Sequence, residues 1–165
     1  MAYTSNKLYG LKGLSNVGLV TGWIYRGARP TREGFKILKE ELGINIVLNL
    51  TEQPDLTHLN MDLIQIAMRN PWNPLMKPDK SKVKQALDFL HNESSNNKRV
   101  YVHCEYGSDR TGVVIAELRK TSGWPPELAL KEMKSFAAGL HILLSGYHKF
   151  VLENKFIQAA REAGR

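Results

Sequence analysis

The stretch Arg99–Leu118 has the sequence RVYVHCEYGSDRTGVVIAEL and contains the features that decide the fold. Its opening, RVYVH, is rich in β-branched and aromatic residues and predicts a short strand. Its end, GVVIAEL, is apolar and predicts a buried helix. The loop between them carries a cysteine, a glycine and an arginine. A strand, a glycine-containing loop and a helix in this order favour an anion-binding turn in an α/β fold.

The chemistry of this loop suits a phosphate dianion held in line with a nucleophile. Inward N–H groups and the start of the helix create a positive field, which also favours the thiolate form of Cys104. Arg110 offers a planar fork for two phosphate oxygens. Gly107 permits a backbone conformation or close approach that a side chain would block. Thr111 can donate its hydroxyl to the Cys104 sulfur when that sulfur leaves.

We expect the same loop to bind the substrate, through Glu105, Tyr106, Gly107, Ser108, Asp109 and Arg110. His103 is expected to hydrogen-bond nearby backbone and to position Cys104 rather than to react itself. The alternative for a lone cysteine is a small buried hydrophobe, for Arg110 a surface salt bridge, and for Thr111 a simple first-turn residue.

Outside this segment, strands and helices alternate along the chain. A hairpin is expected over 16–26, and strands over 44–50 (INIVLNL) and 62–68. Helices are expected over 31–42 and 81–91, from Arg110 onward, from Pro125 to Ala138, and over 146–163. This order predicts an α/β fold with a mainly parallel central sheet flanked by helices. The length of 165 residues suits a single domain spanning 1–165.

Composition narrows the classes of partner. Lys and Arg outnumber Asp and Glu by 23 to 16, a net charge of +7 that favours anionic partners. No recognisable nucleic-acid module accompanies this charge, so no nucleic-acid partner is expected. The one cysteine excludes an internal disulfide and a multi-cysteine zinc site, and no metal or cofactor is expected. With no signal-peptide core in Met1–Ser15 and no apolar span, we expect a cytoplasmic monomer without membrane insertion.

The segment HCEYGSDRTG resembles the HCxxGxxR[ST]G signature of the protein tyrosine phosphatase superfamily. Its late position in the chain is similar to the dual-specificity branch. Tyr25–Pro30 (YRGARP), a helix and then GINIVLNL resemble the opening of small bacterial and fungal members of that branch. The resemblance implies a dual-specificity phosphatase-like fold. It also implies a two-step reaction without metal, in which Cys104 attacks and the phosphoenzyme is then hydrolysed.

The sequence departs from that family at the residue expected to donate a proton to the leaving group. Its members usually take an Asp from a separate loop before the nucleophile, and 69–78 holds none. Asp79 lies slightly late, and the turn Pro-Asp-Lys-Ser before a helix strongly favours Asp79 or Ser81 as an ordinary helix cap instead. Asp109, inside the phosphate loop, is the preferred candidate, because some lipid and triple-specificity phosphatases with an Asp-Arg-Thr ending use that Asp. Asp55 is the third candidate.

The substrate stays open at this level. Tyr106 and Trp72 could wall a phosphotyrosine slot. A polyphosphorylated inositol, a phosphoinositide or a phytase-like substrate would need extra cations at the mouth, for which the candidates are Arg26, Arg29, Lys77 and Lys80. Each of these cations is also compatible with an ordinary solvated surface charge. The rivals are a phosphate-binding pseudophosphatase without turnover and a rhodanese-like sulfurtransferase, whose loop lacks the Arg-Thr-Gly ending.

Overall fold

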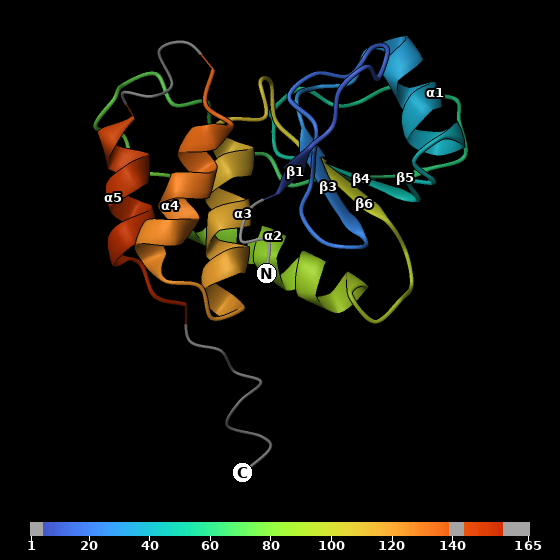
Figure 1. Cartoon of the computed structure of the whole chain (residues 1–165). Coiled ribbons are helices and arrows are strands. Elements are labelled where there is room, and N and C mark those ends of the chain that lie inside the picture. Colours follow the sequence, from blue (N-terminus) through green and yellow to red (C-terminus); the bar gives the residue numbers. More distant parts are fainter. Residues whose placement is uncertain (1–4, 139–143, 157–165) are drawn as a thin grey trace.

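A six-stranded sheet forms the centre of the molecule in the computed structural model, which describes residues 5–138 and 144–156 (Figure 1). The strand order is β1-β2-β3-β6-β4-β5. The bounds are β1 Asn6–Lys7, β2 Gly18–Leu19, β3 Ile24–Gly27, β4 Ile46–Asn49, β5 Asp62–Gln65 and β6 Val100–His103. β3, β6, β4 and β5 run parallel, and β1 and β2 extend the sheet antiparallel from β3.

Helices cover the two faces of the sheet unequally. Among the helices of the described residues, α1 (Arg32–Glu40) alone covers one face, and Figure 1 shows it on the opposite side of the sheet from α3, α4 and α5. The other face carries α2 (Lys80–Glu93), α3 (Arg110–Thr121), α4 (Pro126–Ser135) and α5 (Ser145–Glu153). α3 packs directly against β6, α2, α4 and α5 and is buried from Arg110 to Leu118.

Two apolar clusters explain this layering. Successive side chains of a strand point to opposite faces. Val47 and Tyr101 therefore join Phe35 of α1 in one cluster. Leu48 and Val102 point the other way, into the larger cluster of the four-helix face. All four residues of β4 and of β6 are buried, as expected for strands covered on both faces.

The predicted α/β class with parallel central strands is confirmed, and so is the hairpin, which is formed by β2 and β3. β1 was not predicted, because a two-residue exposed strand leaves no pattern. The last helix was predicted too long. It ends at Glu153, and Asn154 turns extended, with its side chain on Glu117 and its carbonyl on Lys120. Residues 157–163 of that prediction lie outside the described residues. Within those ranges, every helix is too short or too polar to cross a bilayer.

Candidate active site

The loop 104–109 connects the end of β6 to the start of α3, as the sequence predicted. β6 lies between β3 and β4, so the loop sits over the middle of the carboxyl edge of the sheet. Ligands of open parallel sheets commonly bind at this edge. Cys104, the first residue of the loop, is 3% exposed. The nucleophile candidate is thus at the end of a rigid, buried strand.

Four consecutive carbonyl groups of this loop accept hydrogen bonds from outside it. The acceptors are the residues 104–107, and all four contacts are 2.9–3.0 Å long. Their donors, in chain order of the acceptors, are His103 Nδ1, the Arg29 N–H, Asn16 Nδ2 and Arg26 Nη2. Hydrogen bonds from outside the loop to four successive carbonyls suit a turn whose N–H groups face its concave side. That is the geometry of an anion nest at a helix N-terminus.

Gly107 makes the turn of this nest possible. Its φ is +72°, a region that side chains disfavour. A Cβ placed there would lie 2.5 Å from the carbonyl carbon of Gly27, at the end of β3. The expected need for glycine is therefore confirmed on both grounds, backbone conformation and close approach.

Arg110 and Thr111 open α3 directly after the loop. The Arg110 side chain is held by a 3.2 Å hydrogen bond from Nη1 to the carbonyl of Met68, just after β5. The Thr111 hydroxyl is fully buried, and it has no hydrogen-bond partner in the described structure. An unpartnered buried hydroxyl is costly. It is therefore available for a further hydrogen bond.

His103 is fixed on both ring nitrogens. Nδ1 lies 3.0 Å from the Cys104 carbonyl oxygen, which confirms the predicted contact with nearby backbone. Nε2 lies 2.6 Å from a carboxylate oxygen of Asp55, whose side chain is 2% exposed. The other Asp55 oxygen accepts from Arg29 at 3.0 Å. Both neighbours of the ring are acceptors, so both nitrogens are placed to donate. The chain Arg29–Asp55–His103 thus braces the backbone at the nucleophile.

Two of the three acid candidates have structural roles. Asp79 caps α2, accepting from the N–H groups of Ser81 and Lys82. Asp55 is enclosed between Arg29 and His103. Asp109 lies in the loop, 7% exposed, directly before Arg110. Of the three, only Asp109 is part of the loop itself.

The candidates for the mouth divide into buried and exposed side chains. Tyr106 and Trp72 are 57% and 76% exposed, and Lys77 is also exposed. Arg26 was predicted at the mouth and is instead fully buried. Its Nη2 donates to the Gly107 carbonyl, and its guanidinium lies 3.9 Å from the centre of the Phe136 ring. The side chain of an interior strand residue points into the protein, so Arg26 supports the loop from behind.

Three contributions were missed by sequence reasoning. Asn16, with φ +52°, donates to the carbonyls of Tyr106 and Phe136. Asp55 pairs with His103, 48 residues away. Tyr147 of α5 is buried close enough to Arg110 and Cys104 that their charges affect its hydroxyl, although burial is the main cause that raises its pKa. All three depend on long-range neighbours. Only the tolerance of Asn for positive φ was a local signal.

The chain is similar in sequence to known phosphatases. A family model described as the tyrosine phosphatase family matches residues 13–159. The inositol diphosphatase SIW14 of Saccharomyces cerevisiae is 30% identical over 129 residues, covering 74% of this chain and 45% of the yeast protein. The probable tyrosine-protein phosphatase DG1060 of Dictyostelium discoideum is 31% identical over 144 residues, covering 79% of this chain and 81% of that protein.

Solved structures agree on the fold. The catalytic core of Siw14 superposes with a TM-score of 0.76 at 25% identity, covering 90% of this chain and 89% of that one. TpbA of P. aeruginosa superposes with a TM-score of 0.72 at 21% identity, over 90% of each chain. The chain therefore spans less than half of the full-length yeast relative but nearly all of its catalytic core. Among the described residues, no group of three or more His, Cys, Asp and Glu side chains is placed to hold a metal.

Proposed function

We propose, from the premise that this chain belongs to the tyrosine phosphatase family, that it is a cysteine-dependent phosphatase acting through a phosphocysteine intermediate. The observation that carries the proposal is the set of four outward carbonyls at 104–107, which leaves an anion nest around Cys104. A nest of this kind beside a thiol serves phosphoryl transfer by positioning and charge stabilisation.

The first step is attack by the Cys104 thiolate on phosphorus. A sulfur–phosphorus bond forms while the bond from phosphorus to the leaving oxygen breaks. The loop N–H groups and the Arg110 fork bind the nonbridging oxygens as charge develops on them. The leaving oxygen takes a proton, for which Asp109 is our candidate donor.

The second step is hydrolysis of the phosphocysteine. A water oxygen attacks phosphorus and passes a proton to the Asp109 carboxylate left by the first step, the sulfur–phosphorus bond breaks, and inorganic phosphate and the thiolate are released. The unpartnered Thr111 hydroxyl supports a role in donating to the departing sulfur. His103, fixed by Asp55, keeps the Cys104 backbone in place through both steps.

For the substrate, we infer a polyphosphorylated inositol, including one that carries a diphosphate group. Relatives named inositol diphosphatase, SIW14 among them, support this class, as does the net charge of +7. The lack of an Asp in 69–78 supports the diphosphate in particular. A phosphate leaving group has a pKa of about 6 and departs without strong acid assistance, whereas an alkoxide needs a proton.

Phosphotyrosine is the second candidate substrate. The exposed Tyr106, two residues after the nucleophile, offers an aromatic wall beside the loop. We also propose that residues 1–165 act as one catalytic domain and as a cytoplasmic monomer. The lone cysteine suits a reducing compartment, and light scattering of the purified chain tests the monomer.

The test is phosphate release from a panel comprising an aryl phosphate, a phosphotyrosine peptide, inositol hexakisphosphate, a diphosphorylated inositol and a phosphoinositide. Wild type is compared with Cys104→Ser, whose folding is checked by phosphate binding. Loss of release with retained binding is expected. Release that survives Cys104→Ser, or no release from any panel member by folded wild type, would contradict the proposal, and the second outcome would leave a binding module.

The variant Asp109→Asn tests whether Asp109 donates the proton to the leaving oxygen. Hydrolysis of an alkyl phosphate should fall about 10²–10⁴-fold, the usual contribution of a general acid. Hydrolysis of a diphosphate should fall much less, because its leaving group needs little protonation. Equal losses on both would assign Asp109 a structural role instead.

A further inference from the structure

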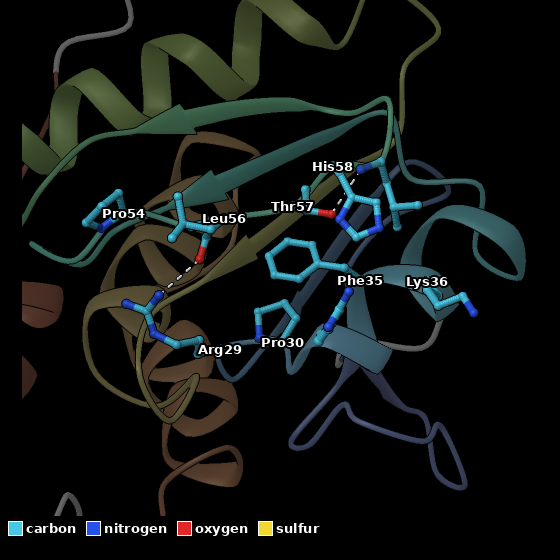
Figure 2. Close-up of a pocket in the computed structure, with 11 residues that line it drawn as sticks. Arg29, Pro30, Phe35, Lys36, Pro54, Leu56, Thr57 and His58 are labelled. Atoms are coloured by element: carbon cyan, nitrogen blue, oxygen red, sulfur yellow. Dashed lines mark hydrogen bonds and ion pairs between the residues drawn. The ribbon is translucent and has the colours of Figure 1, made fainter.

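A cavity of about 370 Å³ lies beside the phosphate loop, between the start of α1 and the loop that follows β4. Figure 2 shows it with Phe35 and Pro30 between Arg29 on one side and Lys36 on the other. Neither Cys104 nor Arg110 lines it. Its size falls within the range of small-molecule sites.

Positively charged side chains outnumber negative ones in the lining of this cavity. Arg32 and Lys36 are exposed, four residues apart, and lie on the same face of α1. His58, from the loop after β4, also lines the cavity. None of the three has an ion-pair partner in the described part of the chain, in contrast to surface lysines such as Lys84, which is paired with Asp88.

The cavity has one acidic lining residue, and that acid is already neutralised. Asp55 gives one carboxylate oxygen to Arg29 and the other to His103. Its side chain is 2% exposed, so it presents little negative charge to the cavity. A buried carboxylate paired with a guanidinium and hydrogen-bonded to an imidazole leaves the unpaired cations of α1 to dominate the local potential.

The cavity adjoins the catalytic loop through Arg29. The Arg29 N–H donates to the Glu105 carbonyl at 3.0 Å, and Arg29 Nε lies 3.1 Å from the Glu105 carboxylate. Glu105 directly follows the nucleophile. The Glu105–Arg29 pair thus forms the border that the loop and the cavity share.

We propose that this cavity is an accessory subsite for a second phosphate of a polyphosphorylated inositol ring, free or lipid-borne, while the first phosphate occupies the phosphate loop. The inference rests on the proposed function and names the feature that selects its substrate class. Arg32 supplies a fork that can bind two phosphate oxygens, Lys36 adds positive charge, and His58 offers a ring nitrogen for a hydrogen bond. Phe35 and Pro30 form a wall that excludes water from part of the ring.

The experiment measures binding in the Cys104→Ser background by calorimetry, so it does not depend on turnover. Two probes are compared, inositol hexakisphosphate and inorganic phosphate. In Arg32→Gln/Lys36→Gln, the ratio of the two affinities should fall roughly tenfold, as expected when two partly exposed ion pairs are lost. The fall should shrink at high ionic strength.

The matched control is Lys131→Gln/Lys134→Gln, which removes two positive charges from exposed positions of α4, outside the cavity. Its ratio should stay within about twofold of the parent, since distant surface charges are screened. Equal falls in the two double variants would overturn the subsite, because net charge alone would then explain them.

A second arm uses phosphatidylcholine vesicles containing a bisphosphorylated phosphatidylinositol. A cavity-specific loss of binding to the free probe, to the vesicles or to both supports the subsite. Which of the two probes is affected shows whether the subsite binds a free inositol phosphate, a lipid-borne one or both. No cavity-specific loss in either arm overturns it. The result is separate from the proposed function, because failure of catalysis would be seen in wild-type turnover while this binding ratio would be unaffected.

Discussion

The back and the front of the phosphate loop are held by two arginines that are three residues apart in sequence but differ in environment. Behind the loop, Arg26 is fully buried, makes one hydrogen bond to Gly107, and leaves Nε and Nη1 without partners in the described structure. In front, the Arg29 side chain is 22% exposed and donates to Asp55, Glu105, Thr51 and Gln53.

Burial accounts for the difference in their electrostatics. It lowers the pKa of Arg26 to about 10, although the charges of Glu132 and Cys104 act in the opposite direction. Arg26 thus remains protonated at neutral pH and places a poorly satisfied positive charge close to the nucleophile. Arg29 is satisfied at the rim, where solvent screens its charge. We infer that the back controls the electrostatics of the loop, whereas the front controls its alignment.

Replacing Gly107, whose carbonyl accepts a hydrogen bond from Arg26 behind the loop, should have the largest effect on activity. Gly107→Ala forces a side chain into φ +72° and against Gly27. The backbone conformation alone costs about 1–2 kcal/mol, and the clash adds to it. We expect kcat/KM to fall at least about 100-fold, since misplacement of about 1 Å has this effect. Gly22→Ala, at an open position with no neighbour within 4 Å, is the control in both kinetics and thermal unfolding.

The next variant, Arg26→Met, separates the effect of the Arg26 charge from the effect of its packing behind the loop. Arg26→Met should lower kcat/KM about 10–100-fold, because the Gly107 carbonyl loses its donor and the loop loses a nearby cation. Stability should change little, since an apolar replacement for a poorly paired buried charge is often neutral. The pH profiles of kcat/KM and of Cys104 alkylation should shift to higher pH, and Arg26→Lys should restore part of the shift. Unchanged profiles would assign Arg26 to packing alone.

Removing the Asp55 charge, which pairs with Arg29 and His103 in front of the loop, should lower kcat/KM less than Arg26→Met does and should lower stability more. Asp55→Asn removes a buried charge that serves both Arg29 and His103. The loss of stability should be about 1–3 kcal/mol, the cost of leaving buried partners poorly satisfied. We expect kcat/KM to fall about tenfold or less, with no shift in the alkylation profile. Asp88→Asn, which breaks the exposed pair with Lys84, is the control for charge and should be nearly silent in denaturant unfolding.

The smallest expected effect is that of Ser108→Ala, at the back. The Ser108 hydroxyl donates to the Phe136 carbonyl at 2.9 Å, and alanine keeps the loop N–H. Loss of this one bond should cost about 1 kcal/mol and leave kcat/KM within about threefold. Ser135→Ala removes a comparable bond from hydroxyl to carbonyl within α4 and calibrates the stability measurement. A rate loss much larger than this one would give Ser108 a direct role at the substrate.

The accuracy of the sequence predictions follows from the range of the interactions involved. β4 and β6 were predictable because continuous apolar runs identify buried strands. The cysteine loop was predictable because its chemistry is contiguous, from His103 to Arg110. The last helix was predicted too long, since its end depends on contacts of Asn154 with Glu117 and Lys120 on α3.

The sequence by itself determined the α/β class, the strand–loop–helix around Cys104, the need for glycine at 107 and the absence of an Asp from 69–78. These are local properties, encoded by neighbours within a few residues. Only the tertiary structure decided that Arg26 lies behind the loop and that Asp55 braces His103. The physical reason is that burial and charge pairing join residues far apart in the chain, and the sheet order that brings them together is not written in any one segment.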